Sequence, residues 1–339
     1  MSEEQTEGVQ VATEDVEADS ASATKSRSQD QPEAEEKKQP ESWFITGANG
    51  NLGQRLIRRL LSEGAMITAV VRSARAEREL TRVFSATSQL RIEVIDYAET
   101  RLLAQAAYSA QYAVHLVGIL KSSKNATYAK AHESSCTSLS RALKNTSVEH
   151  ITYVSILGAR PDSDNPCLAS KGRAERILYR CPIPACTLRV PMVIGERDYA
   201  SKILSQRANL PSSVTFRASS LEQPIYADDV IAAICSAARL GLDGGLNLAG
   251  PESLSRAELY HRAAAVIGRT TRVRSIPMFL GYTMAWFLEL FMSEPPVTRA
   301  MLGVLDHDDD IDVAKALRIL ELDKLTELDE MLRRVVAKS

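Results

Sequence analysis

Three glycines, Gly47, Gly50 and Gly53, have the spacing of a turn that binds phosphate. A short apolar run ending at Thr46 precedes them, and an amphipathic helical pattern follows. The first glycine lets the chain leave the strand sharply, the second lets the backbone approach a pyrophosphate, and the third lets the helix pack closely on the sheet. Free amides at the helix start and the helix dipole favour negative charge. An ordinary glycine-rich turn is the alternative. The strand and helix favour a dinucleotide site contacted by Gly47, Asn49, Gly50, Asn51, Leu52 and Gly53.

The residue that ends the second strand sets the cofactor preference of such a site. An acidic residue there binds the ribose hydroxyls of NAD, whereas an arginine accommodates the 2′-phosphate of NADP. Here the strand 66–71 is followed by Arg72, with Arg75 close behind. We therefore expect NADPH rather than NADH, the alternative being a solvated arginine at a helix start. Asp96, which follows the next strand, is placed either to meet the adenine or to form a turn.

Alternating strands and helices are needed to position these residues. Apolar strand-like runs alternate with helical runs from residue 43 onward, which indicates a parallel sheet covered on both faces. The predicted fold class is α/β, a doubly wound parallel sheet (Rossmann) with a smaller, mainly helical C-terminal lobe. After the first strand and helix, the expected strands are 66–71, 91–95, 112–117, 150–155 and 185–190, and the expected helices are 74–84, 99–110, 127–146 and 168–180.

Composition and pattern divide the chain into three parts. Residues 1–42 hold twelve Asp/Glu against four Lys/Arg and almost no large apolar side chains, so we expect a disordered acidic tail. Residues 43–195 together with 223–250 are assigned to an NAD(P)-binding Rossmann domain. Residues 196–222 together with 251–339 are assigned to the small C-terminal lobe.

Composition also argues against several classes of site. The tail resembles neither a secretory signal nor a transit peptide, and the five cysteines form no CxxC pair, so we expect reduced thiols and a cytoplasmic location. No metal site is expected, because the acidic run 306–312 lacks the glycine and glutamate of a calcium loop; Asp312 is expected to cap the following helix. No nucleic-acid partner is expected, because Arg269, Arg272 and Arg274 form only a solvated cluster.

The segment 276–292 is unusually rich in aromatic residues. It holds five of the eighteen aromatic residues of the chain, yet it is too short for a membrane span, and Pro277, Gly281 and Glu289 interrupt it. We favour a core helix of the small lobe, because clustered aromatic side chains usually lie in a core. The alternative is a docking surface for a protein partner or a membrane surface, which would place the chain peripherally at a membrane.

Several motifs resemble the extended and atypical short-chain dehydrogenases/reductases over residues 43–330. Thr46-Gly47-x-x-Gly50-x-x-Gly53 has the glycine spacing of that family, and the likeness continues in 114–121, 153–155, 189–195 and 226–230. The loop 118–121 and the stretch 170–175 are similar to the group that contains the NADPH-binding accessory subunit of respiratory complex I. The resemblance implies further cofactor contacts from Val117, Gly118, Lys171, Pro191 and Val193. It also implies that Ser155 and Lys171 are the family's catalytic serine and lysine; the alternatives are a polar strand end and a surface lysine.

Cys167 departs from the pattern of this family. Active members carry a tyrosine four residues before the lysine; it exchanges a proton with the substrate oxygen, and the lysine lowers its pKa. Here Cys167 stands four residues before Lys171. We expect a thiol near Lys171 to tend towards the thiolate, which cannot donate a proton, so Cys167 is not expected to be catalytic. Among the other tyrosines nearby in sequence, Tyr128 is the candidate to project into the cofactor cleft.

Two functions therefore remain open. The first is a protein that binds NADPH as a structural or sensing ligand with little or no turnover and docks on a respiratory or membrane-associated partner. The second is an NADPH-dependent oxidoreductase or epimerase with another proton donor, because hydride transfer requires only a positioned nicotinamide.

Overall fold

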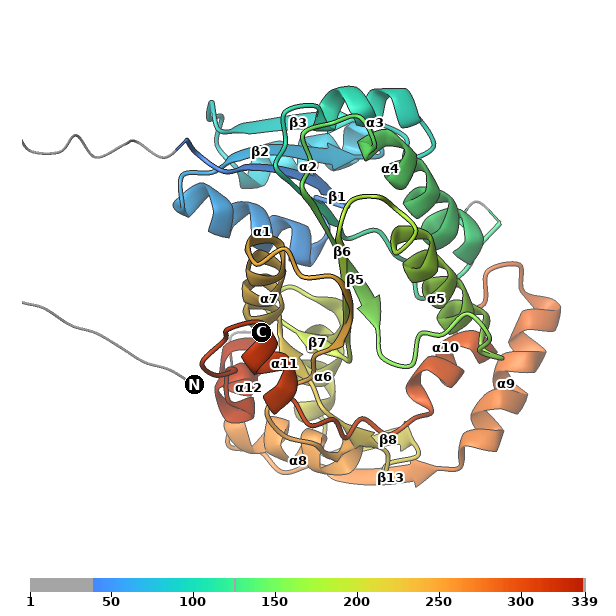
Figure 1. The fold of residues 1–339 in the computed structure, drawn as a ribbon. Coiled ribbons are helices and arrows are strands. Elements are labelled where there is room, and N and C mark those ends of the chain that lie inside the picture. Colours follow the sequence, from blue (N-terminus) through green and yellow to red (C-terminus); the bar gives the residue numbers. More distant parts are fainter. Residues whose placement is uncertain (1–38, 125, 338–339) are drawn as a thin grey trace, which may run out of the picture. The chain divides into compact units, whose positions relative to one another are not determined.

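A seven-stranded parallel sheet lies at the centre of the computed structural model, which describes residues 39–124 and 126–337 (Figure 1). The strand order is that of a doubly wound dinucleotide-binding fold with one strand added at the edge, so the predicted Rossmann fold is confirmed. In sheet order, the strands are β11 (Gly244–Asn247), β6 (Ala185–Val190), β5 (His150–Ile156), β4 (Tyr112–His115), β1 (Ser42–Thr46), β2 (Met66–Val71) and β3 (Leu90–Val94). Nearly all of the predicted tail, residues 1–38, lies outside the described residues.

Helices cover both faces of the sheet, as expected for apolar parallel strands. One face is covered by α1 (Asn51–Ser62), α2 (Ala74–Val83) and α7 (Ala227–Arg239). The opposite face is covered by α3 (Thr100–Ala107), α4 (Ser135–Leu143) and α5 (Pro166–Leu178). Leu56 of α1 and Leu139 of α4 are buried in the two resulting cores.

The segment after β4 differs most from the expected elements. The strand ends at His115 rather than Val117, and a turn of π-helix (Ala129–Ser134) precedes α4 in place of one long helix over 127–146. The π-helical turn carries His132, whose ring accepts a hydrogen bond from the amide of Ile119. Such turns occur often at functional sites. The hydrogen bond of His132 thus connects the loop after β4 to the π-helical turn that precedes α4.

Most of the remaining elements pack on one another. A third core joins three helices, α6 (Tyr199–Ala208), α8 (Arg256–Val266) and α12 (Leu328–Val336). The short helix α11 (Ala314–Ile319) packs instead on the core that contains α1 and α7. Three strand pairs connect this region: β7 (Val193–Ile194) with β10 (Ile225–Tyr226), β8 (Ser212–Phe216) with β13 (Arg272–Ile276), and β9 (Leu221–Glu222) with β12 (Leu254–Ser255). The two-lobe boundaries stay a prediction, since the described residues from Pro40 onward group as one unit.

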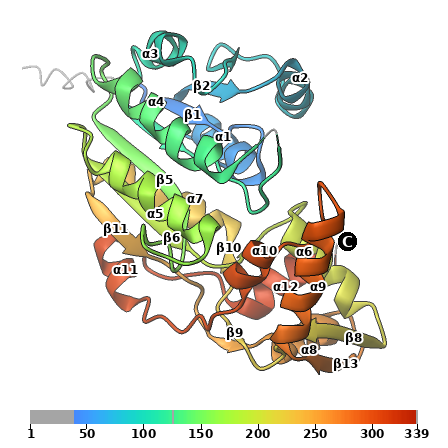
Figure 2. The same ribbon diagram turned by 90° about the vertical axis from the view of Figure 1, so that its right-hand side faces the viewer.

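The helix from the aromatic segment is exposed, so the favoured prediction of a core helix is wrong. α9 (Met278–Phe291) pairs with α10 (Arg299–Leu305) at one side of the molecule (Figure 2). Gly281 and Ala285 are its buried residues, whereas Phe279 is 65% and Phe291 78% exposed. The prediction failed because the helix is apolar on most sides, whereas only one side, with Gly281 and Ala285 at its centre, is buried against the protein. None of the described helices is long and apolar enough to cross a bilayer.

The acidic run 306–312 makes contacts with protein side chains. Asp306 and Asp308 both pair with Arg217. Asp312 accepts a hydrogen bond from the amide of Ala314 at the start of α11, but the N-cap residue of this helix is Val313, so the predicted cap is wrong by one residue. The described residues contain no cluster of three or more metal-binding side chains.

Candidate dinucleotide-binding site

The glycine turn has the backbone geometry that the sequence predicts. Gly47 has a φ of +76°, and a Cβ at this position would lie 3.0 Å from the carbonyl carbon of Leu116. A Cβ at Gly53 would lie 2.5 Å from the carbonyl oxygen of Ala48, so α1 approaches the turn closely only because this residue is glycine. Gly50 precedes α1, and none of the side chains that the structure describes caps the helix start. The first amides of α1 are therefore available to an anion.

Tyr97 contacts this turn, a role that was not predicted from the sequence. Its hydroxyl accepts a hydrogen bond from the amide of Gly47 at 2.8 Å, and its ring is buried. The guanidinium of Arg72 lies 5.7 Å from the centre of that ring, within cation–π range. Asp96 is exposed, and its Oδ1 accepts a hydrogen bond from the amide of Ala98. The only feature of the sequence that could have identified Tyr97 was its position directly after Asp96.

Lys171 is buried at the carboxyl ends of β4 and β5. Its Nζ donates a hydrogen bond to the carbonyl of Val154 at 3.1 Å and lies 4.5 Å from the centre of the Tyr153 ring. A Cβ at Gly118 would lie 2.9 Å from this Nζ, so the loop after β4 approaches the lysine closely. Burial lowers the pKa of Lys171 to about 8. The alternative of a surface lysine is wrong.

Ser155 lies near Lys171 at the end of β5. It is buried, and its Oγ has no hydrogen-bond partner among the residues that the structure describes. A buried hydroxyl without a partner is uncommon in folded proteins. Val117 is buried after β4, while Pro191 and Val193 are half-buried after β6. The structure thus brings these residues to the carboxyl edge of the sheet, where ligands of this fold class bind.

Cys167, in the first turn of α5, is a neutral thiol. It is buried, and its Sγ donates a hydrogen bond to the carbonyl of Ile119 at 3.7 Å. Burial raises its pKa to about 11, which outweighs the opposite effect of Lys171. The predicted tendency towards the thiolate is therefore wrong, because the sequence does not show the cost of desolvating the anion.

Two buried histidines and Tyr128 complete the surroundings of Lys171. His115 shares hydrogen bonds with Thr46 and Ser135, and burial, with Lys171, lowers the pKa values of His115 and His132 to about 3. The hydroxyl of Tyr128 donates to the carbonyl of Leu120 at 2.9 Å, and burial raises its pKa to about 12. Tyr128 shares an apolar cluster with Cys167. The two histidines belong to no recognisable motif and were therefore not identifiable as site residues from the sequence.

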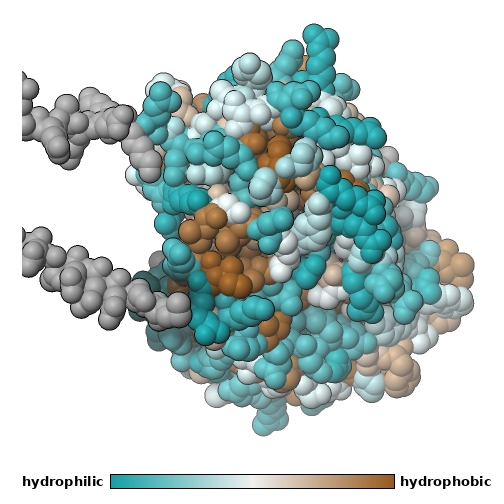
Figure 3. All heavy atoms as spheres, viewed as in Figure 1, coloured by the Kyte–Doolittle hydropathy of each residue, from teal (hydrophilic) through white to brown (hydrophobic). Residues whose placement is uncertain are grey.

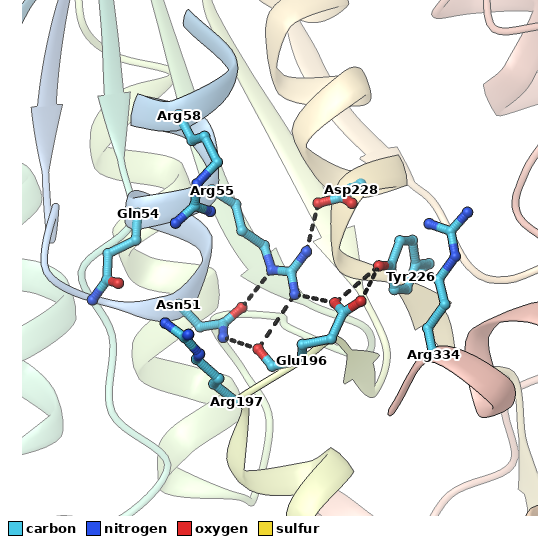
Figure 4. A pocket seen from close by; sticks show the side chains of 9 residues that line it. All are labelled: Asn51, Gln54, Arg55, Arg58, Glu196, Arg197, Tyr226, Asp228 and Arg334. Carbon is cyan, nitrogen blue, oxygen red and sulfur yellow. Dashed lines mark hydrogen bonds and ion pairs between the residues drawn. The ribbon is translucent and has the colours of Figure 1, made fainter. Parts of the chain in front are cut away.

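A polar hollow of about 470 Å³ lies beside the start of α1 (Figure 4). Arg55 crosses it and pairs with Glu196 at 2.5 Å and with Asp228 at 2.7 Å. The side-chain amide of Asn51 donates to the carbonyl of Glu196, and Tyr226 donates to the carboxylate of Glu196. These contacts fix the loop after β7 against α1. Asn51 was predicted to contact the dinucleotide. Its side chain makes a structural contact with the loop after β7.

Comparison with known proteins agrees with this geometry. A family model described as NAD(P)H-binding matches residues 47–219, about half of the chain. A ceramide reductase of Caulobacter vibrioides is 25% identical over 236 residues, which cover 69% of this chain and 73% of that protein. The 40 kDa subunit of mitochondrial NADH-ubiquinone oxidoreductase from Neurospora crassa is 23% identical over 172 residues, covering 50% of this chain and 44% of the subunit.

Solved structures share the fold. A variant UDP-glucuronic acid 4-epimerase from Bacillus cereus, in complex with NAD and a fluorinated UDP-sugar, matches with a TM-score of 0.69 at 17% identity. The match covers 87% of this chain and 98% of the epimerase. The resemblance to atypical short-chain dehydrogenases/reductases is confirmed, and the chain belongs to the NAD(P)H-binding family.

Proposed function

We propose that this protein binds NADPH as a structural or sensing ligand with little or no turnover. The observation that carries the proposal is the state of Cys167. It stands where active members have tyrosine, but its thiol is buried, neutral and already donates to Ile119. A proton donor must reach the reacting oxygen, and a short side chain held in a backbone hydrogen bond is poorly placed to do so. Bound NADPH would still stabilise the folded state by mass action.

The chain's own residues fit each part of a dinucleotide. The amides after Gly50 would bind the pyrophosphate, and Arg72, seated on Tyr97, would bind the 2′-phosphate. Lys171 and Ser155 would bind the ribose and the nicotinamide, which would give the Ser155 hydroxyl the partner that it lacks among the described residues. When bound, the nicotinamide supplies hydride chemistry. These assignments rest on placement at one sheet edge.

A fluorescence titration tests the cofactor assignment. The wild type is expected to bind NADPH more tightly than NADH, and Arg72→Asp to lose that preference. Arg75→Asp is the matched control, because Arg75 is exposed and pairs with Glu79 at 3.0 Å within its own helix. Equal affinity of the wild type for both cofactors would contradict the NADPH assignment. Reduction of any compound in a panel of ketones and aldehydes at ordinary enzyme rates would overturn the proposal of little or no turnover.

A second candidate is an NADPH-dependent oxidoreductase or epimerase that uses Tyr128 as proton donor. Tyr128 lies in the same cluster as Cys167, and its phenol stays protonated because its pKa is about 12. One relative is named as a ceramide reductase, which favours a reductive activity. Under this proposal, Tyr128→Phe removes carbonyl reduction while NADPH affinity is retained. The same activity in Tyr128→Phe and the wild type would exclude this phenol.

We also propose that the protein docks on a respiratory or membrane-associated partner through residues 276–292. Support comes from the exposed apolar residues of α9 and from the likeness to a subunit of NADH-ubiquinone oxidoreductase.

A further inference from the structure

α9 and the residue after it form an exposed apolar surface. The large apolar side chains that are 42–78% exposed are Phe279, Leu280, Met284, Trp286, Phe287, Leu290, Phe291 and Met292. Figure 3 shows paler brown residues at parts of the right-hand margin, on the side where Figure 1 places α9. Surfaces with this many neighbouring apolar side chains mark interaction sites in soluble folds.

α9 carries no unpaired charge on this surface, because its one charged side chain pairs with another residue of the protein. Gly281 packs so closely that a Cβ there would lie 3.0 Å from the ring of Phe216 in β8. Glu289 is the one charged residue of the helix, and its carboxylate pairs with Arg299 of α10 at 2.7 Å. The helix is therefore held from one side, and its ionic group is already neutralised there.

The dimensions of α9 decide how it can meet an apolar environment. Fourteen residues of α-helix extend about 21 Å, which is shorter than the hydrocarbon core of about 30 Å. A helix too short to span can lie at the interface, where Trp side chains sit at headgroup level and Phe and Leu side chains are buried at the boundary with the acyl chains.

Basic residues stand directly before the helix. Arg272 and Arg274 are two residues apart on β13, which leads into α9, so they point to the same face of the strand. Both are exposed, and neither forms an ion pair within the described part of the chain. Arg269, also exposed, donates to a backbone carbonyl and keeps its charge unpaired there. Such a cluster beside an apolar helix complements anionic lipid headgroups.

We propose that α9 inserts into the interface of a bilayer that contains anionic lipids, with Arg272 and Arg274 at the headgroups. This inference deepens the docking part of the proposed function and does not depend on NADPH. The inserted helix would lie close to the candidate site. Asn165 caps α5, the helix that carries Cys167, and its side chain donates a hydrogen bond to the carbonyl of Ala300 in α10, the helix that pairs with α9.

Binding of the full chain to phosphatidylcholine vesicles with and without phosphatidylglycerol tests this proposal. The chain has two tryptophans; Trp43 is buried, so Trp286 reports insertion. We expect co-sedimentation with the anionic vesicles and a blue shift of tryptophan emission that Trp286→Phe removes. The double variant Phe287→Glu with Leu290→Glu is expected to lose both signals, while the matched control Tyr108→Glu, at an exposed apolar position on α3's end, keeps them.

Charge and cofactor arms complete the experiment. Each basic residue near an anionic surface contributes about fivefold in affinity, so Arg272→Gln with Arg274→Gln is expected to weaken binding to anionic vesicles about 25-fold. All variants are titrated with NADPH without vesicles, so that loss of docking and loss of cofactor binding are separated. Unchanged vesicle binding in the α9 double variant would overturn the proposal. Self-association that this variant abolishes, without vesicle binding by the wild type, would assign α9 to a second copy and also overturn it.

Discussion

The hydroxyl of Tyr97 accepts a hydrogen bond from the backbone amide of Gly47 at 2.8 Å. This contact joins the end of β3 to the first turn after β1, two segments that are fifty residues apart in sequence. The same ring supports Arg72. One aromatic residue therefore links the shape of the glycine turn to the residue that we assign to the 2′-phosphate.

Substitutions of Tyr97 should separate these two roles. Tyr97→Phe keeps the ring but leaves the Gly47 amide without its partner, so the free energy of unfolding is expected to fall by about 1 kcal/mol. The NADPH preference should remain. Tyr97→Leu removes the ring as well, and the ratio of NADPH to NADH affinity should fall. Urea unfolding and the two cofactor titrations check these outcomes; an unchanged ratio in Tyr97→Leu would show that the ring does not position Arg72.

Two glycine substitutions distinguish binding from folding at the turn. Gly53→Ala places a methyl group 2.5 Å from the backbone of Ala48, so unfolding free energy should drop by about 1–3 kcal/mol. In Gly50→Ala the nearest atom, the carbonyl oxygen of Gly47, is 3.3 Å away and must shift by a few tenths of an ångström, so the fold should lose less stability than in Gly53→Ala while the pyrophosphate loses its close approach. Thermal unfolding with and without NADPH measures both effects. Full NADPH affinity in Gly50→Ala would place the pyrophosphate elsewhere.

The sequence predicted those parts of the site that depend on local pattern. Gly47 and Gly53 were identifiable because their backbone roles follow from spacing, and the strand before them is a continuous apolar run. Tyr97 and His132 were missed because each meets the site through a contact between distant segments. The state of Cys167 was predicted wrongly because a thiol pKa depends on burial, which no local pattern shows. The exposure of α9 was only the alternative prediction, because apolar composition favours burial but does not show which surface covers the helix.

Thiol reactivity should follow burial rather than the nearby lysine charge. Cys136, Cys167, Cys186 and Cys235 are buried, and burial raises their pKa values to between about 11 and about 12, whereas Cys181 is half-buried. At pH 8 a disulfide reagent should therefore label about one thiol per chain rapidly. Cys181→Ser should remove this fast phase. Rapid labelling of Cys167 in that variant, located by mass spectrometry, would show a thiolate beside Lys171.

Stability should fall as pH decreases from 6.5 towards 3. His115 and His132 have pKa values of about 3 in the folded protein, against 6.5 normally. Between these values the unfolded chain binds a proton at each histidine that the folded chain does not. The free energy of unfolding therefore rises with pH by about 1.4 kcal/mol per unit for each histidine. This contribution is complete above pH 6.5 and is lost as the pH falls through the folded values.

Urea unfolding between pH 6.5 and 5 measures this slope in a range where most carboxylates are still ionised. His132→Gln offers an amide oxygen to the amide of Ile119 and does not titrate, so over this range its slope should be smaller than that of the wild type by about 1 kcal/mol per pH unit. His261→Gln is the control for replacing a histidine by glutamine, because His261 is exposed on α8. Equal slopes in all three proteins would mean that His132 is protonated in the fold, and Lys171 would then face a second positive charge.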